Sequence, residues 1–363
     1  MKNNSYIKRY EVTITTKGPL YIGSGKTINK KEYYFNKKNK KVYLLDFSKM
    51  IKGIMDKKLD TEYKDYMLNA NATMDLGGFF EKFGITEDDI EGWVDYSIDA
   101  SNVYDITQNE ENSFKEKGIN TFIKEYGNKN YIPGSSLKGA IRTALIIDKL
   151  IRNKKDFDEL SKEVINKKNR LGFINKKIET KVLNNNAMNS IRVSDSDIID
   201  NKNMTLCCRM DKDINGNEHN LPIYYECIKP GVDIKTTITI DTSVKDYIGI
   251  DTIKRAISSY SNELFNNFTK FFKGVESYSK DTLFIGGYSG FASKTITYSL
   301  LRDEGVNFVQ KVLNGSFENH EHLKDKELFN ISPRMLKVGE YASNDISGIY
   351  EIGKVEIKFK SKN

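Results

Sequence analysis

The stretch YIPGSSLKGAIRTALIIDKLI, residues 131–151, contains the best-defined helix start in the chain. Pro133 and Gly134 predict a turn, and Ser135 or Ser136 is placed to cap the helix that follows. At about 100° per residue, most of its apolar side chains fall on one face of that helix. Four basic residues fall within one arc of the other face: Lys138, Arg142, Lys149 and Arg152.

The start of this helix is a candidate phosphate site. Free backbone N–H groups and the helix dipole make a helix N-terminus attractive to an anion. Ser135, Ser136, Lys138 and Arg142 are therefore predicted to bind phosphate together. The alternative is an ordinary solvated helix face, because basic residues on a polar face often have no other role.

Two glycine-rich segments predict further phosphate contacts. The first, LYIGSGKT at residues 20–27, follows a strand-like alternation and ends like an ATP-binding P-loop. Leu20 stands where that motif requires glycine, and no apolar helix follows, so ATP hydrolysis is not expected. The second segment is LFIGGYSGFASKT at residues 283–295. Glycine lets backbone N–H groups approach an anion, and Ser, Lys and Arg add donors and charge. The candidate residues are Gly23, Ser24, Gly25, Lys26, Gly286, Gly287, Gly290, Ser293 and Lys294.

The order of elements along the chain predicts an α+β fold. Periodicity indicates a strand, a glycine segment, an insert, the helix at 131–151, a strand, a hairpin, a strand, a helix, a glycine segment and a final strand. This order corresponds to a βαββαβ core with large insertions. The insert, at about residues 60–125, is expected to be helical.

The net charge of +7 is unevenly distributed over the 363 residues. Residues 26–58 carry eleven Lys against three acidic residues, and residues 151–181 carry ten basic against five acidic residues. Residues 75–116, in the insert, carry twelve acidic residues and two Lys. A polyanion would be attracted to the first two stretches and repelled by the third, so the insert is expected to face protein or solvent. A patchy surface without functional meaning is the alternative.

The composition disfavours several other classes of protein. No apolar run approaches the roughly 18 residues needed to span a bilayer, and the first residues do not resemble a signal peptide. The three Cys match neither a disulfide framework nor a zinc site, so a cytoplasmic protein without membrane contact is expected. The three His form no Ser-His or Cys-His arrangement, and DKDING at 211–216 lacks the later Glu of a calcium loop, where Pro222 stands. No cofactor, metal site or catalytic residue is predicted.

Five motifs carry a resemblance to a known family. PLYIGSG, YIPGSSLKGAIRTAL, IRVSDSD, YECIKPGVDI and FIGGYSGFASKT occur in the order found in RAMP proteins of type III CRISPR effector complexes. Among these motifs, IPGSSLKGAIR is the most specific. The length, the acidic insert and the second glycine segment are most similar to the fifth Csm subunit of type III-A complexes.

The resemblance implies a fold and a place in an assembly. The fold would consist of modified RRM-like (ferredoxin-like) modules, with one domain over residues 1–245 and a C-terminal RRM-like region over residues 246–363. A thumb-like β-hairpin would occupy about residues 199–226. Such a subunit caps the head of the complex at the crRNA 3′ end and serves crRNA maturation and antiviral defence. Its implied partners are crRNA, target RNA near that end and other Csm subunits, chiefly the last backbone RAMP subunit.

One departure from the family bears on catalysis. Relatives that cleave target RNA carry an aspartate in the loop after the first strand, whereas GSGKTINKKEYYF, residues 23–35, contains none. A non-catalytic RNA-binding protein is therefore predicted, and the 21 Tyr, 19 Phe and single Trp leave ample scope for base stacking. An RNase that trims or processes crRNA is the alternative.

Overall fold

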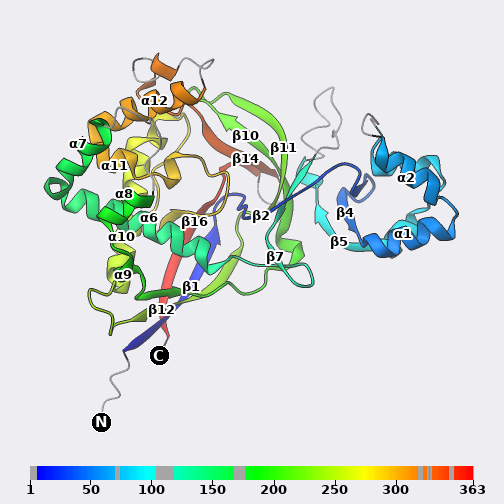
Figure 1. Cartoon of the computed structure of the whole chain (residues 1–363), viewed down its shortest axis with the longest axis horizontal. Helices are drawn as coiled ribbons and strands as arrows, with labels where there is room; N and C mark the ends of the chain where they lie inside the picture. Colours follow the sequence, from blue (N-terminus) through cyan, green and yellow to red (C-terminus); the bar gives the residue numbers. More distant parts are fainter. Residues whose placement is uncertain are drawn as a thin grey trace, which may run out of the picture.

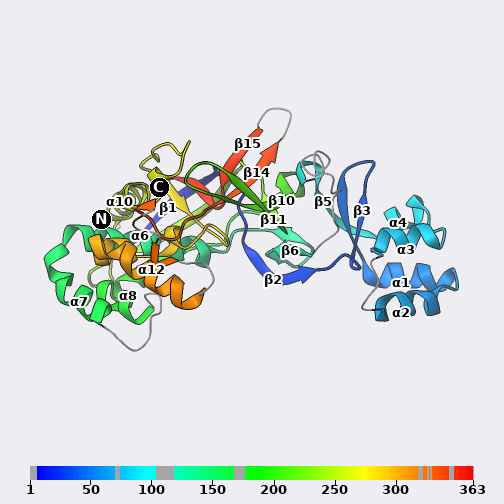
Figure 2. The same cartoon turned by 90° about the horizontal axis from the view of Figure 1, so that it is seen from above.

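A computed structural model gives the fold and describes residues 6–69, 74–103, 118–166, 176–317, 322–324, 327, 329–342 and 347–362. Two β-sheets occupy the middle of the molecule, with one group of helices on one side and a separate helical lobe on the other (Figure 1). Seen from above, these parts follow one another along the longest axis (Figure 2).

The smaller sheet contains the core of the fold. Its strand order is β13-β16-β1-β12-β9, and β16, β1, β12 and β9 are antiparallel to their neighbours. The path β1-α6-β9-β12-α10-β16 is therefore the βαββαβ unit predicted from the sequence, with its strands in the ferredoxin-like order four-one-three-two. The bounds are β1 (Ile7–Thr16), α6 (Gly134–Arg152), β9 (Ile191–Val193), β12 (Asp233–Asp241), α10 (Ile250–Asn267), β13 (Thr282–Phe284) and β16 (Lys354–Lys362).

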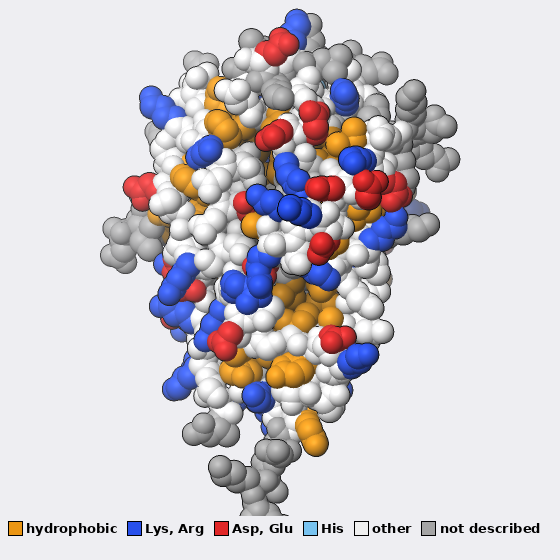
Figure 3. All heavy atoms as spheres, turned by 90° about the vertical axis from the view of Figure 1, so that its left-hand side faces the viewer, with side chains coloured by type: hydrophobic (Ala, Val, Ile, Leu, Met, Phe, Trp, Pro, Cys, Tyr) orange, Lys and Arg blue, Asp and Glu red, His pale blue; other side chains and the backbone are white. Residues whose placement is uncertain are grey.

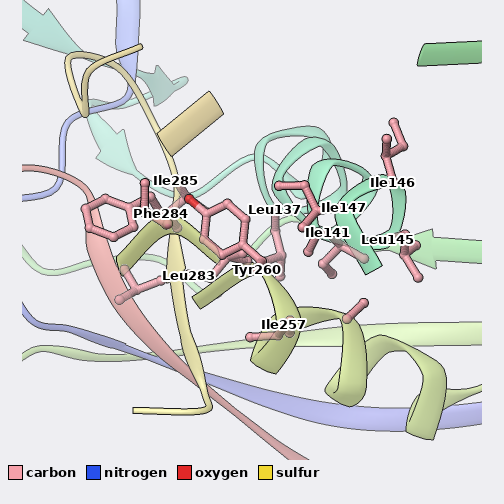
Figure 4. Close-up of a cluster of buried hydrophobic side chains, with 14 of the residues drawn as sticks. Leu137, Ile141, Leu145, Ile146, Ile147, Ile257, Tyr260, Leu283, Phe284 and Ile285 are labelled. Carbon is pink, nitrogen blue, oxygen red and sulfur yellow. The ribbon is translucent and has the colours of Figure 1, made fainter. Parts of the chain in front are cut away.

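The apolar face of this sheet is covered by α6 and α10. Val12 and Ile14 of β1 are fully buried, while the threonines that alternate with them are only partly buried. In Figure 4, Leu137 of α6 and Tyr260 of α10 lie together beside the segment that contains Leu283. The apolar periodicity of both helices thus becomes one continuous core.

The larger sheet is built from segments inserted between elements of the core. Strands β2 to β6 lie between β1 and α6 in the sequence, β10 and β11 between β9 and β12, and β14 and β15 between α10 and β16. These connections all leave the core at the same end. The last residues of β1 and β9 lie at that end, and so do the first residues of β12 and β16. The sheet has the order β2-β6-β11-β10-β5-β4-β3, with β14 paired to β10 and β15 to β14. The bounds are β2 (Gly23–Ile28), β3 (Tyr33–Asn36), β4 (Lys41–Leu45), β5 (Val94–Asp99), β6 (Ile119–Phe122), β10 (Met204–Lys212), β11 (Glu218–Ile228), β14 (Leu336–Ala342) and β15 (Ser347–Glu351).

The helical lobe has a core of its own. Phe79 and Phe80 are buried in it, and the Phe79 ring lies 4.8 Å from the Tyr66 ring. A Cβ atom on Gly53 would lie 2.2 Å from the Trp93 ring, so the first helix of the lobe packs tightly on that indole. The lobe consists of α1 (Phe47–Asp56), α2 (Asp60–Leu68), α3 (Leu76–Lys82) and α4 (Glu87–Trp93).

The predicted helical insert over residues 60–125 is wrong in its bounds. The helices of the lobe begin earlier, at Phe47, and end at Trp93. Strand β5 follows, residues 101–103 are helical again, and β6 and the short strand β7 (Lys124–Glu125) come after the residues that are not described. Pairing partners elsewhere in the chain explain the difference, because β5 pairs with β4 and β6 pairs with β2 and β11. Of the acidic stretch at 75–116, residues 104–116 lie outside the described part of the chain.

The predicted domain boundary at residue 245 falls between strands that belong to the same sheet. Strand β16, assigned to the C-terminal region, is hydrogen-bonded to β1 over eight residue pairs, from Arg9↔Lys362 to Thr16↔Val355. The main hydrophobic core likewise combines residues from both predicted domains. The first and last described strands therefore belong to one folding unit.

The remaining helices lie beside the core, on the side away from the lobe (Figure 1). Viewed from that end, Lys and Arg side chains alternate with acidic and apolar ones instead of forming one positive patch (Figure 3). In the described residues, no helix has the length and apolar character needed to cross a membrane. The bounds are α7 (Asp158–Asn166), α8 (Lys176–Val182), α9 (Asn185–Met188), α11 (Thr297–Leu301) and α12 (Gly305–Ser316), and the short strand β8 (Lys129–Asn130) pairs with β7.

Candidate nucleic-acid interface

The first glycine segment is an edge strand with a bulge, not a loop. Strand β2 pairs with β6 on both sides of the bulge, and three of its residues face the single residue Thr121. The Thr121 hydroxyl lies 2.6 Å from the Ser24 hydroxyl and donates to the Lys26 carbonyl oxygen at 3.2 Å. Gly25 has a φ of +81°, which disfavours any side chain. Gly23, Gly25 and Lys26 are exposed, so the bulge presents backbone and a cation to solvent.

The second glycine segment lies against Tyr21, two positions before the start of β2. The Gly287 N–H donates to the Tyr21 carbonyl oxygen at 2.7 Å. A Cβ atom on Gly286 would lie 2.1 Å from the same oxygen, and its φ is +81°. Gly286 is therefore required for close backbone packing. The fold brings the predicted residues 23–26 and 286–290 together around Tyr21.

Three tyrosines form a cluster where the two segments meet. The Tyr288 ring lies 4.2 Å from the Tyr225 ring and 5.3 Å from the Tyr21 ring, between centroids. Tyr21 and Tyr225 are buried, whereas 39% of Tyr288 is exposed. Burial raises the pKa of the Tyr21 and Tyr225 hydroxyls, so both rings remain neutral at physiological pH. An exposed ring on a rigid base can stack on a nucleobase of any sequence.

Basic side chains border the tyrosine cluster. The Arg209 guanidinium lies 5.8 Å from the centroid of the Tyr288 ring, within cation–π range. Lys337 donates to Asp211 at 2.6 Å, and burial lowers the pKa of this lysine although Asp211 opposes the shift. The Arg209 Nε lies 3.7 Å from the same carboxylate. Two cations thus share one carboxylate, which leaves positive charge beside the exposed ring.

At the end of the second glycine segment, some predicted residues are packed in internal contacts and one is exposed. Ser293 is buried, and its hydroxyl donates to the Ser289 carbonyl oxygen at 2.9 Å. It holds the segment closed and is poorly placed to reach a phosphate. A Cβ atom on Gly290 would lie 3.3 Å from the Lys337 side chain, so this glycine also reflects close packing. Lys294 is exposed and remains available to an anion.

The predicted caps of the helix at 131–151 are wrong. Helix α6 begins at Gly134, so Ser135 and Ser136 lie inside its first turn, and Pro133 at the cap position has no donor or acceptor in its side chain. The Gly134 N–H instead donates to the Asp195 carboxylate at 2.7 Å. One of the free N–H groups expected to attract a phosphate already has an anionic partner.

Lys138 and Arg142 also have partners within the chain. The Lys138 ammonium donates to the Ile191 carbonyl oxygen at 2.6 Å, and burial together with nearby Arg192 lowers its pKa. Arg142 donates to the Asn185 side chain at 3.2 Å. These contacts connect α6 to β9 and α9, whereas the two glycine segments meet at Tyr21. A phosphate role for Ser135, Ser136, Lys138 and Arg142 stays a prediction, and these contacts weaken it.

The predicted hairpin is present as β10 and β11. Both strands are internal to the larger sheet, since β10 also pairs with β5 and β14, and β11 with β6. Met204, Leu206 and Met210 are buried, so the apolar side chains of β10 belong to the core. The hairpin supplies Arg209 and Tyr225 to the candidate interface.

Sequence reasoning missed the tyrosine cluster and Arg209. One signal was available, because Tyr288 is the only aromatic residue between the glycines of IGGYSG. Tyr21 and Tyr225 come from segments about 200 residues apart, and only the fold brings them together. Among the described residues, no three His, Cys, Asp or Glu side chains gather as a metal site.

Comparison with known proteins agrees with the resemblance seen in the motifs. Curated relatives called "CRISPR system Cms protein Csm5" include one from Enterococcus italicus, 27% identical with 80% of each chain covered. Another, from Mycobacterium tuberculosis, is 24% identical, with 98% of this chain and 99% of the relative covered. A third, from Streptococcus thermophilus, is 29% identical, with 82% of each covered.

Solved structures and a family model agree with the fold. A chain of "Cryo-EM structure of Csm-crRNA-target RNA ternary complex in type III-A CRISPR-Cas system" matches with a TM-score of 0.64 at 20% identity, covering 96% of this chain and 100% of that one. The "Crystal structure of T.onnurineus Csm5" matches with a TM-score of 0.56 at 17% identity, covering 95% and 99%. The family model described as the RAMP superfamily matches residues 13–309. With most of its length matched by that model, the chain belongs to the RAMP superfamily.

Proposed function

We propose that the chain is a non-catalytic subunit of a type III-A CRISPR ribonucleoprotein that binds crRNA and caps the head of the complex at the crRNA 3′ end. Membership of the RAMP superfamily and similarity to proteins called Csm5 support this proposal. Its partners are crRNA, target RNA near the crRNA 3′ end and other Csm subunits, chiefly the last backbone RAMP subunit. In this place it aids crRNA maturation and antiviral defence in the cytoplasm.

The observation that carries the RNA-binding proposal is the exposed Tyr288 ring beside the β2 bulge. The ring is partly exposed for stacking, the Arg209 guanidinium lies within cation–π range of it, and Lys26 in the bulge is exposed to a phosphate. An aromatic ring can stack on any base, and a cation can neutralise any backbone phosphate. The interface therefore suits a guide RNA whose sequence varies from one complex to another.

The absence of catalysis is part of the proposal. Residues 23–35, after β1, contain no aspartate, and the rival function is an RNase that trims crRNA. The test incubates the purified full chain with end-labelled crRNA, with and without magnesium, and measures both binding and cleavage. Binding without cleavage is the expected result. Cleavage that survives further purification would replace this proposal by the RNase.

A further inference from the structure

A second candidate RNA site is a groove of about 710 Å³ between the helical lobe and the edge of the larger sheet. Its volume lies within the range of roughly 300–1,000 Å³ that is typical of small-ligand sites. Ser24 and Lys26 of the β2 bulge line it, so the groove continues directly from the candidate interface. The groove is separate from the tyrosine cluster, whose residues do not line it.

The two walls of the groove differ in chemistry. The wall from the lobe is apolar and contains Phe47, Met50, Tyr63, Met67 and Leu76. The facing wall, from β2, β6 and β7, is more polar: it contains Ser24, Lys26, Thr121, Lys124 and Glu125, together with the apolar Ile28, Phe122 and Ile123.

Two aromatic rings at the groove are unusually exposed. Phe47, the first residue of α1, is 64% exposed, and Tyr126, in the turn after β7, is 100% exposed. Exposed apolar surface rimmed by polar residues commonly marks a binding groove, and both rings line this one. Phe47 belongs to the lobe and Tyr126 to the turn after β7, so each side of the groove carries one exposed aromatic ring.

Of the described residues, three lysines and two glutamates line the groove, and Lys26 is the lysine at the bulge. Lys31 donates to the carbonyl oxygens of Tyr66 and Asn69, which holds the end of α2 beside the groove. Lys124 pairs with buried Glu226 at 2.5 Å. Lys26 is exposed, close to the Ser24 and Thr121 hydroxyls that fix the bulge.

We propose that this groove holds one unpaired nucleotide of the bound RNA. Its base packs against Phe47 and Tyr126, and its phosphate lies at Lys26. The amphipathic pair of walls matches a nucleotide, which has an apolar face and an anionic backbone. The inference rests on the proposed function and adds to it a site for a single-stranded nucleotide, whose base is free to pack against a side-chain ring.

The test compares single-stranded and duplex RNA of equal length, each labelled with fluorescein, on the full chain. The double substitution Phe47→Ala/Tyr126→Ala removes both exposed rings. It should weaken single-strand binding about tenfold, as expected for the loss of stacking on one base, and leave duplex binding unchanged. The matched control is Met55→Ala/Leu68→Ala, which removes two exposed apolar side chains of the same lobe that do not line the groove. It should bind both RNAs like the wild type.

Three results would overturn this inference. First, the Phe47/Tyr126 variant could bind single-stranded RNA like the wild type while Tyr288→Ala binds it poorly. This result would reject the groove and leave the proposed function standing. Loss of a neighbouring Csm subunit from the variant without loss of RNA affinity would assign the groove to a protein. A wild-type chain that binds neither RNA would reject both the groove and the proposed function. A cross-link from 4-thiouridine RNA to the peptide that contains Tyr126 would support the groove directly.

Discussion

Tyr288 combines an exposed ring with an unfavourable backbone conformation. Its φ is +57°, in the left-handed region that costs a residue with a Cβ atom about 1 kcal/mol or more. Glycine or asparagine would relieve that strain, and glycine occupies three neighbouring positions of the same segment. The buried rings of Tyr21 and Tyr225 hold the tyrosine in place, so the strain is compensated by packing. Backbone strain of this kind is often found at functional sites.

Removal of the Tyr288 ring should therefore affect RNA more than folding. Tyr288→Ala should weaken binding of single-stranded RNA by about 1–3 kcal/mol, the range for one stacked base. Tyr288→Phe keeps the ring and should bind like the wild type. Tyr247→Ala, which removes another exposed tyrosine, is the control. Fluorescence anisotropy measures the three affinities, and wild-type affinity of Tyr288→Ala would contradict a stacking role.

At the scale of single elements, α6 shows what the local sequence could predict. Its start at Gly134 agrees with the predicted turn at Pro133 and Gly134, because helix starts are marked by neighbouring residues. Its cap is Asp195, 61 positions away in the sequence, which no local pattern indicates. The glycines of the second segment are a similar case. The sequence predicts phosphate contacts for them, yet Gly286 is fixed by its approach to Tyr21, a contact that only the fold creates.

Loss of the Asp195 cap should destabilise the protein. Asp195→Ala leaves the Gly134 N–H without its partner and should lower the free energy of unfolding by about 1 kcal/mol. Asp197→Ala changes an exposed acid in the same loop and should stay within about 0.5 kcal/mol of the wild type. Urea unfolding followed by circular dichroism measures both. Equal stability of the two variants would show that Asp195 is not the cap.

Helix α4 of the lobe gives a prediction of pH dependence. Lys57 donates to Asp89, and the Thr86 N–H and hydroxyl add hydrogen bonds, which together lower the pKa of Asp89 to about 2. Because the pKa is lower in the folded state, the ionised carboxylate stabilises the fold above its ordinary pKa of 3.8. This stabilisation is lost as the pH falls from about 4 toward 2.

The substitution Asp89→Asn removes the charge from this capping box. It should lower the free energy of unfolding by about 1 kcal/mol at pH 7, and the difference from the wild type should shrink as the pH falls below about 4. Asp88→Asn is the charge-matched control, because the capping box uses Asp89. Urea unfolding at pH 7, 5 and 3.5 provides the comparison. A difference that stays constant over this range would mean that the charge of Asp89 does not stabilise the helix.

At the scale of the whole molecule, one core carries the larger sheet at one end, and the helical lobe lies beyond that sheet (Figure 1). The βαββαβ order was predictable, because each strand and helix has its own periodicity. The fourth core strand is predicted as a strand, but its partner is not, since the C-terminal strand β16 returns to pair with β1 across nearly the whole chain. Strand pairing depends on distant partners, so a boundary at residue 245 could be placed between elements that belong to one sheet. The sequence predicts insertions at about residues 60–125 and 199–226, but not that strands from three insertions pair into the one sheet on which the candidate interface lies.

The salt dependence of RNA binding should separate the predicted phosphate ligands. Lys26→Ala/Lys294→Ala removes two exposed cations near the glycine segments. The slope of the logarithm of the RNA-binding constant against the logarithm of the salt concentration should decrease in magnitude by about 1.4, or about 0.7 per phosphate contact. Lys138→Ala/Arg142→Ala breaks internal hydrogen bonds and should reduce stability while changing the slope little. Anisotropy titrations at several salt concentrations measure both slopes. The reverse pattern would return the main phosphate site to the start of α6.

The most direct test of the RNA interface is a cross-linking map of the assembled type III-A complex. The complex is reconstituted with crRNA that contains 4-thiouridine near its 3′ end, irradiated, digested and analysed by mass spectrometry. The expected result is cross-links from intact crRNA to peptides with residues 21–27 and with Tyr288. Cross-links confined to other subunits, or to the first turn of α6, would contradict an interface built on the β2 bulge and the tyrosine cluster.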